Sequence, residues 1–201
     1  METYITRLCW NENDWKKPSG HAAKSETKSF NTKFGFGIEE WLFSSKFEIN
    51  GWRYGFVQGV NKSRKKQAGK LINLLFFTIN PNKRRYLVCE IRNCYVFKED
   101  EQEKRDIHKF IAKELISKMV IDIKSVGGKP DIITKDKMKR KTSEDIVNIK
   151  YKSCNLTVFP ELILVPINSI ICKLNRYQLI SVHDKKKYID EWNQIKTKNN
   201  L

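Results

Sequence analysis

The sequence predicts an α+β domain built around a strongly bent sheet or a small β-barrel, with one long helix and a C-terminal helix. Segments with strand-like alternation outnumber helical ones, and the longest helical pattern separates two groups of strands. Strand groups of this kind often curl or close, which protects their edges. At 201 residues and 40% hydrophobic composition, the chain can bury one substantial core. We therefore expect a single domain over residues 1–201.

The first half of the chain predicts strands and a well-defined hairpin. Asn50 and Gly51 stand within alternating residues 47–58, which is typical of a tight β-hairpin. The 21–33 stretch is polar and fits a loop or a short helix. The other expected elements are a strand at 4–10, a loop at 11–20, a basic loop at 61–70, and strands at 71–78 and 86–97.

The second half begins with a change to helical periodicity. Ile107, Phe110, Ile111, Leu115 and Met119 follow helical spacing, which predicts an amphipathic helix of about five turns that ends before Gly127. The remaining expected elements are a basic linker at 129–141, strands at 146–151, 156–159, 162–165 and 177–182, and a C-terminal helix at 185–196. Prolines at 160 and 166 confine the neighbouring strands to sheet edges or strand ends.

The charge balance indicates a polyanionic partner. Lys and Arg total 39 against 23 Asp and Glu, so the formal net charge is +16, and nucleic acid is a natural ligand for such a surface. A basic face that serves only solubility is the alternative. Two basic loops flank the predicted strand at 71–78, and they form either two patches or one groove. No membrane-length apolar run or signal-peptide pattern occurs, so we expect a cytoplasmic protein.

The motifs of catalysis and of cofactor binding are absent from the sequence. There is no P-loop, no zinc-deaminase motif and no nucleophile motif. The five cysteines contain no Cys-x-x-Cys pair, which favours reduced core thiols over disulfides or a metal site. Pro130-Asp131 lacks the later carboxylate-lysine pair of a metal-dependent nuclease, although that class stays as an alternative. We expect a binding module with no catalytic residue, no metal and no cofactor.

The segment Phe34–Phe43 is the strongest candidate for a binding site. It places aromatic rings, two glycines and the pair Glu39-Glu40 within ten residues. Aromatic faces stack on flat rings, glycines allow close backbone approach, and a carboxylate accepts a hydrogen bond from an exocyclic amine. Together they predict one wall of a nucleobase pocket. The alternatives are that the rings form core and that both carboxylates are exposed.

Three parts of the chain resemble the PUA-like superfamily, in particular the EVE and SRA readers of modified bases. They are the Trp10–Gly20 segment, the Phe34–Phe43 block with the Tyr54–Phe56 hairpin strand, and the late pieces at 148–152 and 174–177. The resemblance is to the N-terminal reader modules of modification-dependent restriction proteins, and we expect the reader alone because the sequence contains no His-Asn-His nuclease motif. It implies a barrel-like fold whose cleft accepts a base flipped out of the duplex.

The resemblance implies a non-catalytic reader of double-stranded DNA that carries a modified base, with 5-methylcytosine favoured. Its role would lie in restriction or phage defence, with a nuclease subunit or domain as partner; an RNA-binding PUA or YTH-like module is the alternative. The expected modified-base pocket comprises Trp10, Asn11, Trp15, Ser19, Phe36, Glu39, Glu40, Trp41 and Tyr54. The expected contacts to the nucleic-acid backbone are Arg53, Arg64, Lys65, Lys66, Lys83, Arg84, Arg85, Lys139, Arg140 and Lys141.

Overall fold

The protein folds around one open sheet, shown by a computed structural model that describes residues 1–20, 30–134, 146–183 and 186–200. The strands are β1 (Thr3–Leu8), β2 (Glu48–Ile49), β3 (Trp52–Gly55), β4 (Leu71–Ile79), β5 (Arg85–Val96), β6 (Ile149–Lys152), β7 (Leu156–Leu164) and β8 (Ile180–Ser181). The helices are α1 (Phe30–Phe34), α2 (Gln58–Lys62), α3 (Arg64–Gln67), α4 (Gln102–Phe110), α5 (Ile116–Ser125), α6 (Asp131–Thr134) and α7 (Lys187–Lys198).

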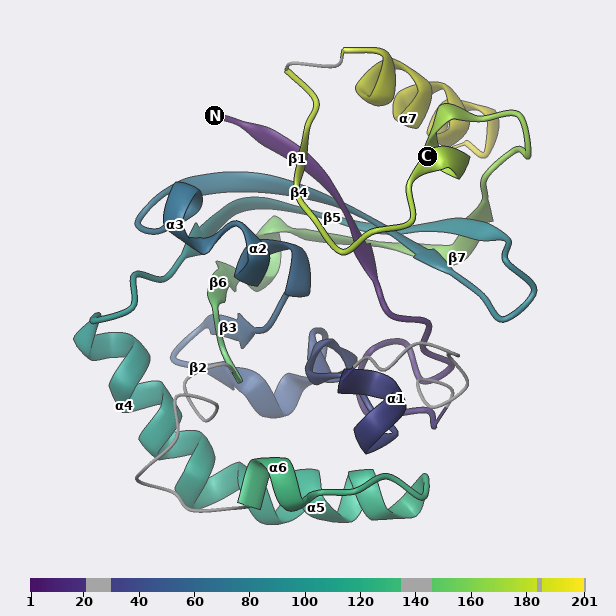
Figure 1. The fold of residues 1–201 in the computed structure, drawn as a ribbon. Helices are drawn as coiled ribbons and strands as arrows, with labels where there is room; N and C mark the ends of the chain where they lie inside the picture. The colour runs from purple at the N-terminus through teal and green to yellow at the C-terminus, as the bar shows by residue number, and fades with distance from the viewer. Residues whose placement is uncertain (21–29, 135–145, 184–185, 201) are drawn as a thin grey trace.

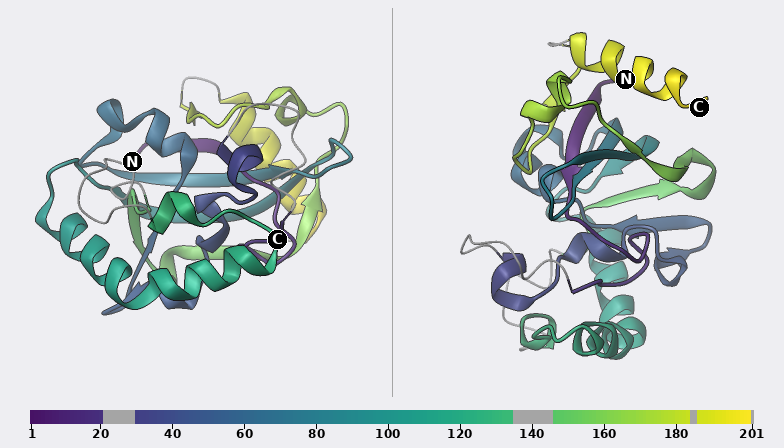
Figure 2. Two further views of the ribbon diagram at one scale, coloured as in Figure 1. Left: turned by 60° about the horizontal axis from the view of Figure 1, so that its bottom comes forward. Right: turned by 90° about the vertical axis from the view of Figure 1, so that its right-hand side faces the viewer.

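The sheet has eight strands in the order β2-β3-β6-β5-β4-β1-β8, and β7 also pairs with β5. Figure 1 shows β3 and β6 turned steeply relative to β4 and β5. Figure 2 shows α7 and the α4–α5 helices on opposite sides of the sheet. The α+β class is therefore confirmed. Closure into a small β-barrel is wrong, because β2 and β8 end the sheet as separate edges.

The centre of the sheet brings distant parts of the chain to one end. β1 runs parallel to β4, and β5 runs antiparallel to it, so that Leu8, Thr78 and Tyr86 lie in one row across three strands. The chain leaves β1 and turns from β4 into β5 just beyond this row. This end of the sheet is consequently where residues from both regions can meet.

Helix α7 covers one face of the sheet through a buried polar contact. Trp192 is fully buried, and its Nε1–H donates a hydrogen bond of 2.9 Å to the Glu90 carboxylate on β5. Lys196 donates to the same carboxylate oxygen at 2.6 Å. The ring of Trp192 packs with Ile5 and Leu87 in the same apolar cluster. Burying Glu90 is tolerated because donors from α7 satisfy its charge.

The long helix covers the hairpin side of the molecule. α4 and α5 are joined by a π-helical turn (Ile111–Leu115), so helix runs without interruption from Gln102 to Ser125. Four members of its predicted apolar stripe are buried, which confirms the helix and its inward face, whereas Phe110 is 39% exposed. The π turn accounts for the change of direction between α4 and α5 in Figure 1. Among the described helices, none has the length and apolar composition needed to cross a bilayer.

Several other predictions can be compared directly with the elements. The hairpin is confirmed, with Asn50 and Gly51 both at positive φ (51° and 75°) between β2 and β3. The predicted strands at 156–159 and 162–165 are one strand, β7, with a register shift near Pro160. β7 pairs along one side only, so the missing N–H of proline breaks no second ladder.

Two predictions of local structure are wrong. The basic stretch at 61–70 is not a loop, because Lys and Arg side chains are compatible with a helix and α3 forms there. The predicted strand at 177–182 reduces to β8, and Tyr177 lies in an irregular segment before it. That segment carries side-chain contacts instead of a strand ladder, as described below.

Replacing Trp192 with phenylalanine tests how α7 is held. The change removes one donor from the buried Glu90 carboxylate, so we expect the free energy of unfolding to fall by about 1–3 kcal/mol, measured by urea denaturation. Trp10→Phe is the matched control, since Trp10 Nε1 donates to Glu12 at an exposed position; its effect should stay below about 0.5 kcal/mol. Equal losses in the two variants would contradict this role of Glu90.

Candidate nucleic-acid interface

Glu40 holds together the loop that follows β1. Its Oε1 accepts hydrogen bonds from Asn11 Nδ2 (2.9 Å) and from the Ser19 backbone N–H (3.0 Å), and its Oε2 accepts one from the Gly37 N–H (2.8 Å). Asn11 Oδ1 in turn accepts from the Trp15 N–H at 2.9 Å. We therefore correct the prediction that Asn11, Ser19 and Glu40 read a base edge, because their polar groups are engaged inside this loop.

Glu39 joins the end of β1 to the start of α2. Its two carboxylate oxygens accept the backbone N–H groups of Cys9 (3.0 Å) and Gln58 (2.7 Å), and only 3% of the residue is exposed. Burial raises the pKa of Glu39 to about 7, although those hydrogen bonds and the charge of Arg7 act in the opposite direction. Glu39 is thus a buried acceptor between two backbone segments and does not face an open pocket.

Most of the predicted stacking rings lie in the core. Trp15, Phe36, Trp41 and Tyr54 are 3%, 0%, 3% and 4% exposed, respectively. Phe36 and Trp41 pack edge to face with centroids 5.9 Å apart. A base needs an accessible ring face, and these four rings offer none in this structure. Their predicted role in a pocket is corrected to core packing.

Two of these rings also anchor the long helix through their polar atoms. Trp41 Nε1 donates to Asp122 on α5 at 3.1 Å, and the Tyr54 hydroxyl donates to Glu103 on α4 at 2.9 Å. Burial and the bond to Glu103 raise the pKa of the Tyr54 hydroxyl well above its usual range. The aromatic block of the sequence is consequently the surface on which the α4–α5 helices dock.

Trp10 differs from the other predicted rings because it is partly exposed. It lies at the end of the sheet beside Tyr86, which is also partly exposed, with ring centroids 5.9 Å apart. Both residues stand on or just beyond the row that joins β1, β4 and β5. Aromatic surface is therefore accessible at this end of the sheet.

Arg7 and Tyr177 meet on the opposite face of the same end of the sheet. The guanidinium carbon of Arg7 lies 4.7 Å from the centre of the Tyr177 ring, and Arg7 Nη1 donates to the Asn175 carbonyl at 2.8 Å. Burial, followed by the neighbouring Cys9 thiol, raises the pKa of the Tyr177 hydroxyl far above its usual range. Neither residue was among the predicted site residues. The available signal was a basic residue, Arg7, within the predicted strand at 4–10.

Further cations lie on the segment that carries Tyr177 and on the neighbouring β4–β5 turn. Arg85 Nε donates to the Leu174 carbonyl at 3.4 Å, which places the β4–β5 turn against the segment that carries Tyr177. We define the arginine–tyrosine patch as Arg7, Lys83, Arg84, Arg85, Lys173, Arg176 and Tyr177. Within the described part of the chain, none of its six cations is within ion-pair distance of a carboxylate. This patch includes three of the residues predicted to contact the nucleic-acid backbone, Lys83, Arg84 and Arg85.

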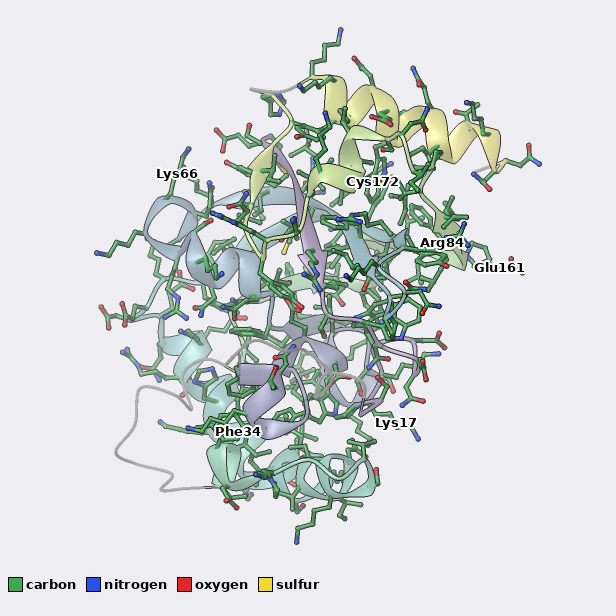
Figure 3. All side chains as sticks on the ribbon, turned by 45° about the vertical axis from the view of Figure 1, so that its right-hand side comes forward. Lys17, Phe34, Lys66, Arg84, Glu161 and Cys172 are labelled. Atoms are coloured by element: carbon green, nitrogen blue, oxygen red, sulfur yellow. The ribbon has the colours of Figure 1, made fainter. Side chains whose placement is uncertain are left out.

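The other residues predicted to contact the nucleic-acid backbone lie outside this patch. Arg53 forms an ion pair with Glu48 (3.0 Å), and Arg64 bonds to the Asn61 side chain. Lys65 and Lys66 are exposed on α3, at the opposite end of β4 from the arginine–tyrosine patch. Figure 3 shows Lys66 and Arg84 reaching out on opposite sides of the molecule. The remaining three, Lys139, Arg140 and Lys141, lie outside the described residues.

All five cysteines are free, and Cys9, Cys89 and Cys94 are buried. In the described ranges, no group of three or more His, Cys, Asp or Glu side chains is arranged to hold a metal ion. An open hollow on α7 is lined by polar side chains from Asp190 to Lys198 and contains no residue predicted from the sequence.

Glu39→Gln should weaken the pH dependence of stability. The pKa of Glu39, about 7 in the folded protein, exceeds an unfolded value of about 4.3. Its stabilising contribution is therefore complete below about pH 4 and is lost as the pH rises through about 7. From pH 5 to pH 8, we expect the native protein to lose about 1–3 kcal/mol of unfolding free energy through this group. The variant should lose less, as measured by urea denaturation at both pH values.

The matched control for this experiment is Glu161→Gln. Glu161 is an exposed carboxylate on β7, and Figure 3 shows it at the edge of the molecule. Its variant should keep the pH profile of the native protein. Parallel profiles for all three proteins would contradict the assignment of the pH dependence to Glu39.

Comparison with known proteins adds no relative to this description. No protein-family model matches the chain, and no curated protein or solved structure does so either.

Proposed function

We propose that this protein binds nucleic acid through the arginine–tyrosine patch. The observation that carries the proposal is that six cations at the end of β1, on the β4–β5 turn and on the adjoining segment that carries Tyr177 have no described carboxylate partner. Like charges at close range repel one another, and a phosphate backbone relieves that repulsion while it releases counterions. Arginine is well suited to this role because its planar guanidinium can make two parallel hydrogen bonds to a phosphate.

Accessible rings beside these cations supply a second mode of contact. Tyr177 already accepts a flat cation, Arg7, against its face, and the partly exposed pair Trp10 and Tyr86 lies at the same end of the sheet. Stacking of a base on such a ring contributes about 1–3 kcal/mol. The cations would therefore bind the phosphates of the nucleic-acid strand, while one or more of these rings stack on a base.

More specifically, we propose that the protein is a non-catalytic reader of duplex DNA that carries a modified cytosine. We propose that it is related to the PUA-like superfamily. This proposal is supported by contacts that join segments of the resemblance to the end of β1 and to the loop that follows it. Glu40 binds the loop after β1, Glu39 binds Cys9, and Tyr177 contacts Arg7. Recruitment of a nuclease in restriction or phage defence is the biological role we propose for such a reader.

Arg84→Ala and Arg176→Ala test the phosphate contacts. Each variant should bind a duplex about 3- to 10-fold more weakly at 0.1 M salt, and should reduce the slope of log K against log salt by about 0.9. The measurement is fluorescence anisotropy with a labelled duplex at several salt concentrations. Unchanged slopes in both variants would overturn the proposed interface.

Lys118→Ala is the matched control for these variants. Lys118 is exposed on α5, on the far side of the sheet from α7 (Figure 2). The Lys118→Ala variant removes one positive charge from a different surface. Its affinity for the duplex and its slope of log K against log salt should stay close to those of the native protein. A loss as large as that of Arg84→Ala would indicate an effect of net charge alone.

The finer proposal predicts tighter binding to a duplex with 5-methylcytosine than to the same unmodified duplex. A buried methyl group contributes about 0.8 kcal/mol, so we expect at least about a fourfold preference. Tyr177→Ala should reduce the preference more than Trp41→Ala, because Trp41 lies in the core. Equal affinities for the two duplexes would remove the reader function. Stronger competition by single-stranded RNA than by duplex DNA would favour an RNA-binding module instead.

A further inference from the structure

Three lysines on α2 and α3 lie at the far end of β4 from the arginine–tyrosine patch. Lys62, Lys65 and Lys66 are exposed, and none has an ion pair with a carboxylate among the residues described. Glu2 is the acidic side chain near this group, and its carboxylate bonds to the Tyr4 hydroxyl. We call Lys62, Lys65 and Lys66 the lysine patch.

The segment that carries Tyr177 connects the two patches. At one end, Arg85 binds the Leu174 carbonyl. At the other end, the start of α2 packs directly on Gln178, since a Cβ added to Gly59 would lie 3.2 Å from the Gln178 backbone carbon. Figure 1 shows this segment passing in front of β1 between the β4–β5 turn and α2. α2 then leads straight into α3 and its lysines.

We infer that the two patches form one continuous binding band, and that its ligand is a nucleic-acid duplex of about nine base pairs or longer. This inference rests on the proposed function and extends it from one patch to the whole band. The sequence alone does not decide whether the basic residues on either side of β4 form two separate patches or one groove. The contacts of residues 174–178 with Arg85 and with the start of α2 favour one continuous surface.

The length of the ligand follows from the length of β4. Its nine residues span about 30 Å at roughly 3.3 Å per residue. A duplex rises about 3.4 Å per base pair, so about nine base pairs reach from one patch to the other. A duplex stays straight over that distance because its persistence length is about 150 base pairs. A rigid ligand can therefore contact both patches at once, with the gain of two linked binding sites.

The inference is tested with two DNA hairpins that share one loop and have stems of 6 and 14 base pairs. The variant is Lys65→Ala with Lys66→Ala, and the control is Lys118→Ala with Lys124→Ala, which removes two exposed cations from α5. The variant should bind the long stem about 5- to 20-fold more weakly, with a salt slope lower by about 1.8. Its affinity for the short stem should change less than twofold. The control should bind both stems as the native protein does.

Several other results would contradict the inference of one continuous binding band. One is an equal effect of the lysine variant on both stems, or no effect on either. Another is that a 14-nucleotide single strand binds as tightly as the long stem. If the native protein binds the short stem, and that binding depends on Arg84 and Arg176, the proposed function stands although the band fails. Absence of binding to either stem would overturn both.

Discussion

The geometry of the proposed interface depends on two adjacent buried carboxylates. Glu39 and Glu40 point to different partners, so a single turn of chain holds the exit of β1, the start of α2 and the loop that contains Asn11. Buried carboxylates are costly unless donors satisfy them. Here backbone N–H groups supply those donors, and the loop closes around them. Trp10 and Arg7 are positioned on either side of this junction, which links it to the cationic surface.

The elements that the sequence predicted well are those whose signals are local. The hairpin is specified by Asn50 and Gly51, and the long helix by an apolar stripe with one fixed period. The role of the aromatic block could not be obtained in this way. Rings that line a pocket and rings that fill a core have the same composition, and the difference lies in distant partners. For Trp41, that partner is Asp122, 81 positions along the chain.

The candidate site was predictable only in part for the same reason. The turn cations Lys83, Arg84 and Arg85 were expected to contact nucleic acid from their charge alone. The contact of Arg7 with the segment around Tyr177, in contrast, joins residues about 170 positions apart: Arg7 binds the Asn175 carbonyl. Sheet topology creates this contact, because parallel pairing of β1 with β4 brings the end of β1 beside the β4–β5 turn. No local pattern specifies such a pairing.

The placement of the cations is also consistent with the stability of the fold. Those of the arginine–tyrosine patch lie on a turn, on an irregular segment or near the end of a strand, and those of the lysine patch lie on two short helices. Such positions contribute little to the core, so charge can accumulate there without loss of apolar packing. The buried carboxylates behave differently, since Glu39, Glu40 and Glu90 are each matched by donors from other segments of the chain. The cations of the proposed band stand on the surface, where a polyanion can neutralise them.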